Sequence, residues 1–174
     1  MPMRALIDLP NIEYLDGAAY PKVSPKRTHA IVQGRVWSIL STAAGRRGAV
    51  GTEWDVHPGK VDDTNTTLVP DVAFVSRERL ATLDAADREE PPFSPDIAIE
   101  IWSPSNDRRY LDRKIAKYLA TGAVLVLDVD PFARTIAAHD ATSLRQFQIT
   151  ETFEHSAIPW LVFPVADAFQ DLDD

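Results

Sequence analysis

Three short runs of apolar residues limit how this chain can fold. They are Leu68–Val75, Ile97–Trp102 and Val124–Val129. A strand that is apolar on both sides belongs in the middle of a sheet whose two faces are covered. Between the second and third runs, Ser103–Asn106 offers helix caps and an apolar stripe continues toward Gly122, which suits a crossover helix between parallel strands. We therefore expect an α/β (mixed α+β) fold, with a mixed central sheet flanked by helices.

Shorter signals complete the expected order of elements. Asp16-Gly17 between apolar runs favours a hairpin from Ile12 to Val23. Ser24-Pro25 is typical of a helix N-cap and first helical position, and helical spacing of apolar residues extends that helix to Gly45. Alternation predicts a half-exposed strand at Thr52–His57. The remaining expectations are loops at Pro58–Thr67 and Asp84–Pro95, a short helix at Arg77–Leu83, strands at Arg134–His139, Leu144–Ile149 and Trp160–Phe163, and a helical turn at Val165–Phe169.

Composition excludes several classes of protein. The 174 residues contain no linker or repeat, so a single domain over 1–174 is expected. The absence of cysteine excludes a disulfide framework and a cysteine nucleophile, and His57, His139 and His155 show no metal-ligand spacing that would indicate zinc. No stretch is long enough to span a membrane and the first ten residues lack a signal-peptide core, so the cytoplasm is the default expectation. The net charge of −8 argues against tight nonspecific nucleic-acid binding, although a metal ion can neutralise a local acidic cleft.

The most informative residues are two acids, Asp71 and Glu100, that lie inside apolar runs. Burying an isolated carboxylate is costly, and two carboxylates on neighbouring strands repel unless a cation lies between them. Mg²⁺ takes oxygen ligands from one or two carboxylates and keeps waters for a phosphate substrate. Asp96 falls on the same strand face as Glu100 by the period of two. The alternatives are that Asp71 and Asp96 only cap turns after Pro70 and Pro95, and that Glu100 forms a buried ion pair.

Residues on the two long helices could complete such a site. Lys114 lies at the border of the buried stripe, where its ammonium could stabilise charge on a phosphate, whereas Lys117 is expected to point to solvent. His29 lies on the apolar stripe of the first helix, and Gln33 lies at the edge of that stripe. The alternatives are a surface lysine whose stem covers apolar neighbours and a structural histidine.

Longer motifs run through almost the whole chain. In the middle are PDVAFVSRERL (70–80), PDIAIEIWSPSNDRRYLDRKIAKYLATGA (95–123) and VLDVDPFARTI (126–136), and at the ends are IEYLDG (12–17), SPKRTHAIVQG (24–34) and IPWLVFPVADAF (158–169). Together they resemble the bacterial Uma-two family of restriction-endonuclease-like proteins, part of the PD-(D/E)XK nuclease-like superfamily. The resemblance implies a restriction-endonuclease-like core, a mixed sheet flanked by helices.

The resemblance also implies a divalent metal, Mg²⁺ or Mn²⁺, held by two acids. Asp71 matches the aspartate of the family's PD motif, and Glu100 matches the acid that follows it. The superfamily's lysine would stand two residues after that acid, where this chain has Trp102, and Lys114 on the next helix is the matching residue.

One departure from the family concerns the N-terminal hairpin. Many relatives carry a glutamate directly after the Asp-Gly turn, where this chain has Ala18. Glu13 is a poor candidate to replace it, so we do not expect the hairpin to supply a further acid.

These features favour a Mg²⁺- or Mn²⁺-dependent endonuclease that hydrolyses phosphodiester bonds of DNA. Asp71 and Glu100 would bind the metal, and Lys114 would position the attacking water. Cutting both strands favours a homodimer. The alternatives are a noncatalytic binding or regulatory protein that keeps the fold, which the acidic net charge favours, and a hydrolase of small phosphate esters. Basic residues near both helices could contact phosphates: Lys22, Lys26, Arg27, Arg35, Arg108, Arg109 and Arg113.

Overall fold

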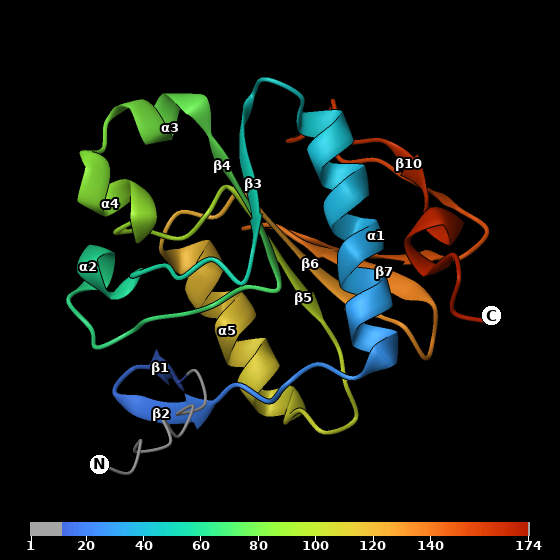
Figure 1. Ribbon diagram of the computed structural model, residues 1–174, viewed down its shortest axis with the longest axis horizontal. Coiled ribbons are helices and arrows are strands. Elements are labelled where there is room, and N and C mark those ends of the chain that lie inside the picture. Colours follow the sequence, from blue (N-terminus) through green and yellow to red (C-terminus); the bar gives the residue numbers. More distant parts are fainter. Residues whose placement is uncertain (1–11, 174) are drawn as a thin grey trace, which may run out of the picture.

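In a computed structural model, which describes residues 12–173, the three apolar runs form neighbouring strands in the middle of one sheet (Figure 1). This six-stranded sheet has the order β3-β4-β5-β6-β7-β8. Its strands are β3 (Gly48–Thr52), β4 (Val72–Ser76), β5 (Ile97–Ile101), β6 (Leu125–Asp130), β7 (Thr135–His139) and β8 (Leu144–Gln148). Only β5 and β6 pair in parallel, and helix α5 (Arg108–Ala120) joins them. The expected mixed α/β fold is confirmed.

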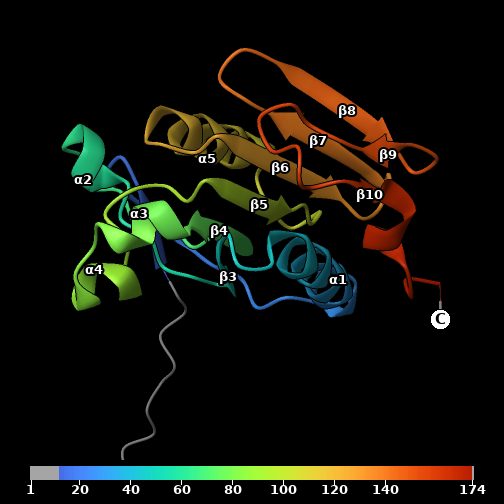
Figure 2. The same cartoon turned by 90° about the horizontal axis from the view of Figure 1, so that it is seen from above.

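One long helix covers each face of the sheet (Figure 2). Helix α1 (Arg27–Ala44) packs on one face and α5 packs on the other. Side chains of β5 alternate between them: Ile97 and Ile99 join the apolar cluster under α1, and Ala98 joins the cluster under α5. Every residue of β5 is buried, because both faces of the strand are covered.

Smaller elements surround the sheet. The hairpin of β1 (Ile12–Leu15) and β2 (Ala18–Pro21) turns at Gly17, whose φ of 84° is readily adopted only by glycine. The hairpin is tied to the rest of the protein by a β-bridge between Tyr14 and Thr67, and Leu15 belongs to the apolar cluster under α5. The other elements are α2 (Gly59–Asp62), α3 (Arg77–Ala81), α4 (Ala85–Glu89), β9 (Thr152–Phe153), β10 (Phe163–Pro164) and the 3₁₀ turn η1 (Val165–Phe169).

The expected strand at Thr52–His57 was wrong. Strand β3 ends at Thr52, and Glu53 has a φ of 51°, which turns the chain out of the sheet. Beyond this turn only Val56 pairs, in an isolated bridge with Leu68. The alternation in the sequence reflects the burial of Val56 between more exposed neighbours.

Three other local expectations also need correction. The strand expected at Trp160–Phe163 is a shorter strand, β10, that begins only at Phe163. Helix α1 begins at Arg27, not at Ser24-Pro25, because Lys26 still has extended dihedral angles and its carbonyl accepts the first helical hydrogen bond, from Ala30. The expected loops at 58–67 and 84–95 each contain a short helix, α2 and α4.

Across residues 12–173, no helix combines the length and apolarity needed to span a membrane. The ten residues examined for a signal-peptide core lie outside the described part of the chain.

Candidate active site

Asp71 and Glu100 face each other across two neighbouring strands. Strands β4 and β5 are antiparallel with Val72 opposite Ile99, so Asp71, which precedes β4, falls opposite Glu100. Their exposed fractions are 3% and 6%. The Oδ2 atom of Asp71 accepts a hydrogen bond of 2.7 Å from the backbone N–H of Ile101. The strand pairing therefore holds both carboxylates at the same end of the sheet.

Two basic side chains reach Asp71 from outside the sheet. Lys22, which follows β2, places Nζ 3.1 Å from Oδ1, and His29 in the first turn of α1 places Nε2 3.0 Å from Oδ2. Burial opposes the ionisation of Asp71, but Lys22 and His29 outweigh it and hold the pKa of Asp71 well below its usual range. Burial also opposes protonation of His29, but its hydrogen bond to Asp71 and the charge of Asp71 raise the pKa of His29. Asp71 is therefore ionised at neutral pH.

Glu100 has a different environment. Its Oε1 atom accepts a hydrogen bond of 2.8 Å from the Tyr118 hydroxyl and lies 2.8 Å from Nζ of Lys114. Burial, assisted by the charges of Asp71 and Glu13, outweighs the attraction of Lys114 and raises the pKa of Glu100 to about 7. Two neighbouring carboxyl groups with pKa values displaced in opposite directions are typical of sites that combine charge stabilisation with proton transfer.

Lys114 joins Glu100 to a third buried acid, Glu13 of β1. Its Nζ atom lies 2.8 Å from Oε1 of each carboxylate, and its side chain is only 4% exposed. Burial lowers the pKa of this ammonium, but the two glutamates outweigh burial and raise the pKa above its usual range. Glu13 is oriented by the backbone N–H of Val69, at 2.7 Å, and by the Tyr110 hydroxyl, at 2.9 Å. Lys114 therefore stays charged across the physiological pH range.

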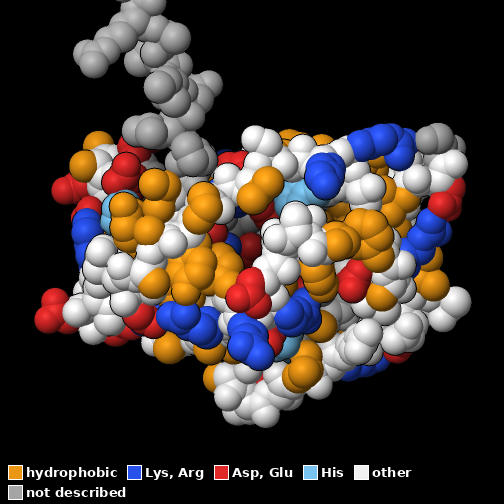
Figure 3. Space-filling view, turned by 90° about the horizontal axis from the view of Figure 1, so that it is seen from below, with side chains coloured by type: hydrophobic (Ala, Val, Ile, Leu, Met, Phe, Trp, Pro, Cys, Tyr) orange, Lys and Arg blue, Asp and Glu red, His pale blue; other side chains and the backbone are white. Residues whose placement is uncertain are grey.

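These groups line a pocket of about 180 Å³. One wall is the segment Lys22–Lys26 that leads into α1, and another comes from residues of Ser103–Asp107 that lead into α5. Figure 3 shows this side of the molecule, with acidic side chains visible in a hollow near the middle of the face. The carboxylates of Asp71 and Glu100 therefore lie on the wall of a cavity.

The structure brings most of the residues singled out in the sequence to this pocket. Asp71, Glu100, Lys114 and His29 all line it. Gln33 lies beside them on α1, where its amide donates to the backbone oxygen of Asp71 at 2.9 Å and to Oε1 of Glu53 at 2.7 Å.

Asp96 does not reach the pocket. It lies before the first residue of β5, where it accepts a hydrogen bond of 2.8 Å from the N–H of Ser76 and forms an ion pair of 3.3 Å with Arg79. It shares a strand face with Glu100, but four residues along a strand correspond to about 13 Å.

The expectation that Lys117 points freely to solvent was wrong. Its side chain is only 11% exposed, and Nζ lies 2.5 Å from carboxylate oxygens of both Asp16 and Asp62. Asp16 lies in the hairpin turn and Asp62 lies in α2. A helical wheel of α5 contains neither acid, so it could not predict these contacts.

Glu13 and Lys22 are the pocket residues that sequence reasoning undervalued. The expectation that the hairpin supplies no acid is overturned by the position of Glu13, which is 3% exposed and contacts Lys114. One available signal was that Glu13 shares a strand face with the apolar Leu15, which is fully buried. Lys22, which the sequence suggests only as a phosphate contact, lies 3.1 Å from Asp71 and 2.7 Å from Glu53.

The donor atoms of the pocket suit a hard divalent cation. The carboxylates of Asp71, Glu100 and Glu13 offer only oxygen, the ligand type that Mg²⁺ and Mn²⁺ prefer. Asp71 and Glu100 bring such oxygens to one end of the sheet, where both line the pocket, so the residues present fit such an ion.

Comparison with known proteins identifies the family and the fold. The model of the family Uma2, described as "Putative restriction endonuclease", matches residues 4–166. A crystal structure described as a putative nuclease belonging to DUF820, from Anabaena variabilis ATCC 29413, has a TM-score of 0.80 and 20% sequence identity, covering 92% of this chain and 90% of that one. No curated protein matches the sequence. At this identity the structural likeness shows a shared fold.

Proposed function

This chain belongs to the Uma2 family of restriction-endonuclease-like proteins, and we propose that it is a divalent-metal-dependent endonuclease acting on phosphodiester bonds of DNA. The observation that carries the proposal is the meeting of Asp71, Glu100 and Lys114 in one buried pocket. Acids with displaced pKa values beside a fixed ammonium are the groups that hydrolysis of a phosphodiester requires.

Each group has a distinct task in this proposal. Asp71 and Glu100, assisted by Glu13, would hold Mg²⁺ or Mn²⁺, which when bound supplies Lewis-acid activation of the phosphate. Lys114 would place its positive charge beside the phosphate oxygens, where negative charge develops. Glu100 has a pKa of about 7 without the ion and would release its proton as the ion binds.

The entrance to the pocket offers contacts for the nucleic-acid backbone. Lys22 and Lys26 line one side, and Ser103 and Ser105 line the other. These groups provide local donors to phosphates in a chain whose net charge is −8. Cutting both strands of a duplex takes two such sites, and we propose a homodimer as the assembly that supplies them.

A noncatalytic protein that binds nucleic acid through the same pocket is the second candidate. The observation that favours it is the pairing of each buried acid with a lysine: Asp71 with Lys22, and Glu100 and Glu13 with Lys114. In this network every buried acid already contacts a cation without any metal ion, as it would in a purely structural ion cluster.

The test is cleavage of supercoiled plasmid DNA in Mg²⁺ or Mn²⁺, with a chelator as the blank. We expect nicked and linear products, and we expect Asp71→Asn to lower the rate by about 100-fold or more because the metal loses a charged ligand. Asp112→Asn is the matched control, since it removes the same charge from a 63% exposed side chain on α5. If no DNA is cut with either ion and Asp71→Asn leaves DNA binding unchanged, the endonuclease proposal fails.

A further inference from the structure

A second group of metal-ligating side chains lies outside the pocket, in the segment that follows β3. Asp55 and His57 flank Val56, which is buried and exchanges two backbone hydrogen bonds of 2.9 Å with Leu68. Because side chains alternate along an extended chain, Asp55 and His57 project to the same side, opposite Val56. None of these residues lines the pocket of Asp71 and Glu100.

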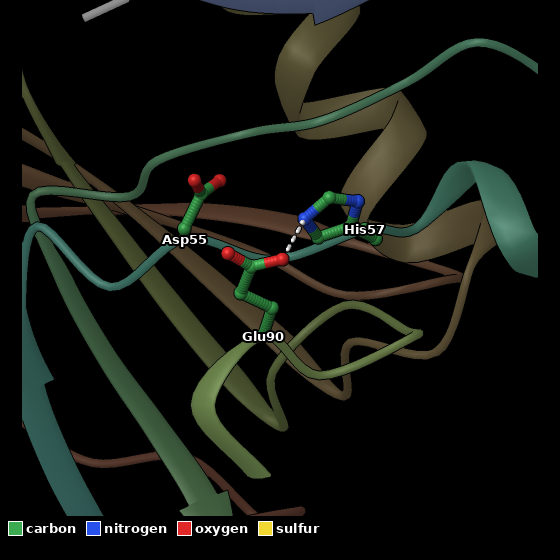
Figure 4. A group of neighbouring side chains, drawn as sticks. All are labelled: Asp55, His57 and Glu90. Carbon is green, nitrogen blue, oxygen red and sulfur yellow. Dashed lines mark ion pairs between the residues drawn. The ribbon is translucent and has the colours of Figure 1, made fainter. Parts of the chain in front are cut away.

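A third ligand, Glu90, reaches them from the segment after α4. Two hydrogen bonds hold that segment against residues 54–57: Trp54 Nε1 donates to the carbonyl of Glu89, and the N–H of His57 donates to the carbonyl of Pro91, each at 2.8 Å. One oxygen of Asp55, one oxygen of Glu90 and one nitrogen of His57 all lie within 4.8 Å of one another. Figure 4 shows the three side chains gathered around one small space.

The polar atoms of this group lack partners that would satisfy them. Within residues 12–173, Oδ1 of Asp55 is buried and has no hydrogen-bond partner. Nε2 of His57 is also buried; it lies 3.0 Å from Oε2 of Glu90, but the angles of that ion pair do not form a hydrogen bond. A buried carboxylate oxygen without a donor is costly, and a cation placed between these atoms would remove the cost.

The imidazole of His57 is also oriented for coordination. Its Nδ1 atom contacts the Thr67 hydroxyl at 3.5 Å. In the tautomer whose Nδ1–H donates to that hydroxyl, Nε2 would keep a free lone pair for a metal ion. Metal-bound histidines commonly have their second nitrogen fixed in this way.

We propose that Asp55, His57 and Glu90 form a binding site for a divalent transition-metal ion of the zinc type. Imidazole nitrogen and carboxylate oxygen are both ligands of Zn²⁺, whereas Mg²⁺ prefers oxygen alone. Water completes the tetrahedral coordination. The bound ion joins the segment after α4 to the segment after β3. No pattern in the sequence indicates this site, because Glu90 is distant along the chain from Asp55 and His57 and only the fold brings it near.

The test is a zinc titration of the metal-free full-length protein, followed by calorimetry and by the melting temperature. We expect one zinc ion to bind and raise the melting temperature, and Glu90→Gln to weaken zinc binding by about tenfold or more. Glu89→Gln is the matched control, because it removes the same charge from the adjacent residue, whose side chain lies outside the cluster; its zinc affinity should stay within about twofold.

Two further variants separate this site from the pocket. Asp71→Asn should retain zinc binding, since Asp71 belongs to the other site. His57→Ala should abolish the visible absorption spectrum of bound Co²⁺ that reports the imidazole ligand. The proposal is overturned if the wild-type protein binds no zinc, if Glu90→Gln and His57→Ala bind zinc as tightly as the wild type, or if Asp71→Asn alone removes binding.

Discussion

Glu100→Gln should make the metal-free protein more stable at alkaline pH. The folded-state pKa of Glu100 is about 7, raised first by burial, against an ordinary value of 4.5. As pH rises from 4.5, the unfolded chain releases this proton before the folded chain does. The free energy of unfolding therefore falls between about pH 4.5 and 7, and above that window the full penalty of a buried carboxylate remains.

The magnitude follows from the same two pKa values. The interval from 4.5 to about 7, at about 1.4 kcal/mol for each pH unit, corresponds to about 3 kcal/mol of penalty at pH 8. Glutamine resembles the protonated acid in shape and keeps an oxygen that can accept from Tyr118 and Lys114. The stability gain of Glu100→Gln should therefore be small at pH 5 and approach about 3 kcal/mol at pH 8.

The assay is urea unfolding at pH 5, 6, 7 and 8 in the presence of a chelator. Glu89→Gln, at an exposed glutamate, should give a curve parallel to that of the wild type at every pH. Addition of Mg²⁺ at pH 8 should stabilise the wild type and leave Glu100→Gln almost unaffected. A stability difference between Glu100→Gln and the wild type that does not change from pH 5 to 8 would refute the reasoning.

Two other changes test the structure by their effect on the free energy of unfolding, measured with urea at pH 7.5. Lys114→Met should lower the free energy of unfolding by about 3–5 kcal/mol, because it leaves two buried carboxylates without their cation. The control Lys60→Met, at a side chain that is 57% exposed, should change it by no more than about 0.5 kcal/mol. Equal effects of the two substitutions would contradict the buried network. Gly48→Ala should lower the free energy of unfolding by about 1–3 kcal/mol, because the added Cβ would lie 2.1 Å from the carbonyl oxygen of Val75. Gly34→Ala should raise it by about 0.5–1 kcal/mol, because open space surrounds this position in α1 and alanine favours a helix. A gain from both alanines would contradict the packing of β3 on β4.

Local patterns in the sequence were enough to predict the centre of the fold. The continuous apolar runs predict β4, β5 and β6, and the apolar stripe between Ser103 and Gly122 predicts α5. Burial on one face or on both faces of an element is visible directly in the spacing of its apolar residues. The turn after Thr52 left no such trace, since the positive φ of Glu53 is not encoded by a glycine or asparagine. The alternation there was therefore mistaken for a strand.

Only part of the candidate site could be predicted from the sequence, for a related reason. Asp71 and Glu100 were recognisable because an acid in an apolar run is conspicuous, and two adjacent strands suffice to bring them together. Glu13 was discounted, and the freedom of Lys117 was overstated, because their partners lie on distant segments. Lys117 meets Asp62, which is 55 residues away, and no pattern within α5 could reveal it.

The contact between Glu13 and Lys114 also bears on when the site can exist. The two residues are 101 positions apart, so the ribosome adds the lysine on the order of 5–20 s after the glutamate. During that interval the hairpin has no cation for its acid, and closing so long a loop costs entropy that only the packed α5 can recover. A nascent chain truncated before α5 would therefore contain all three acids of the pocket but not the lysine that joins Glu13 to Glu100.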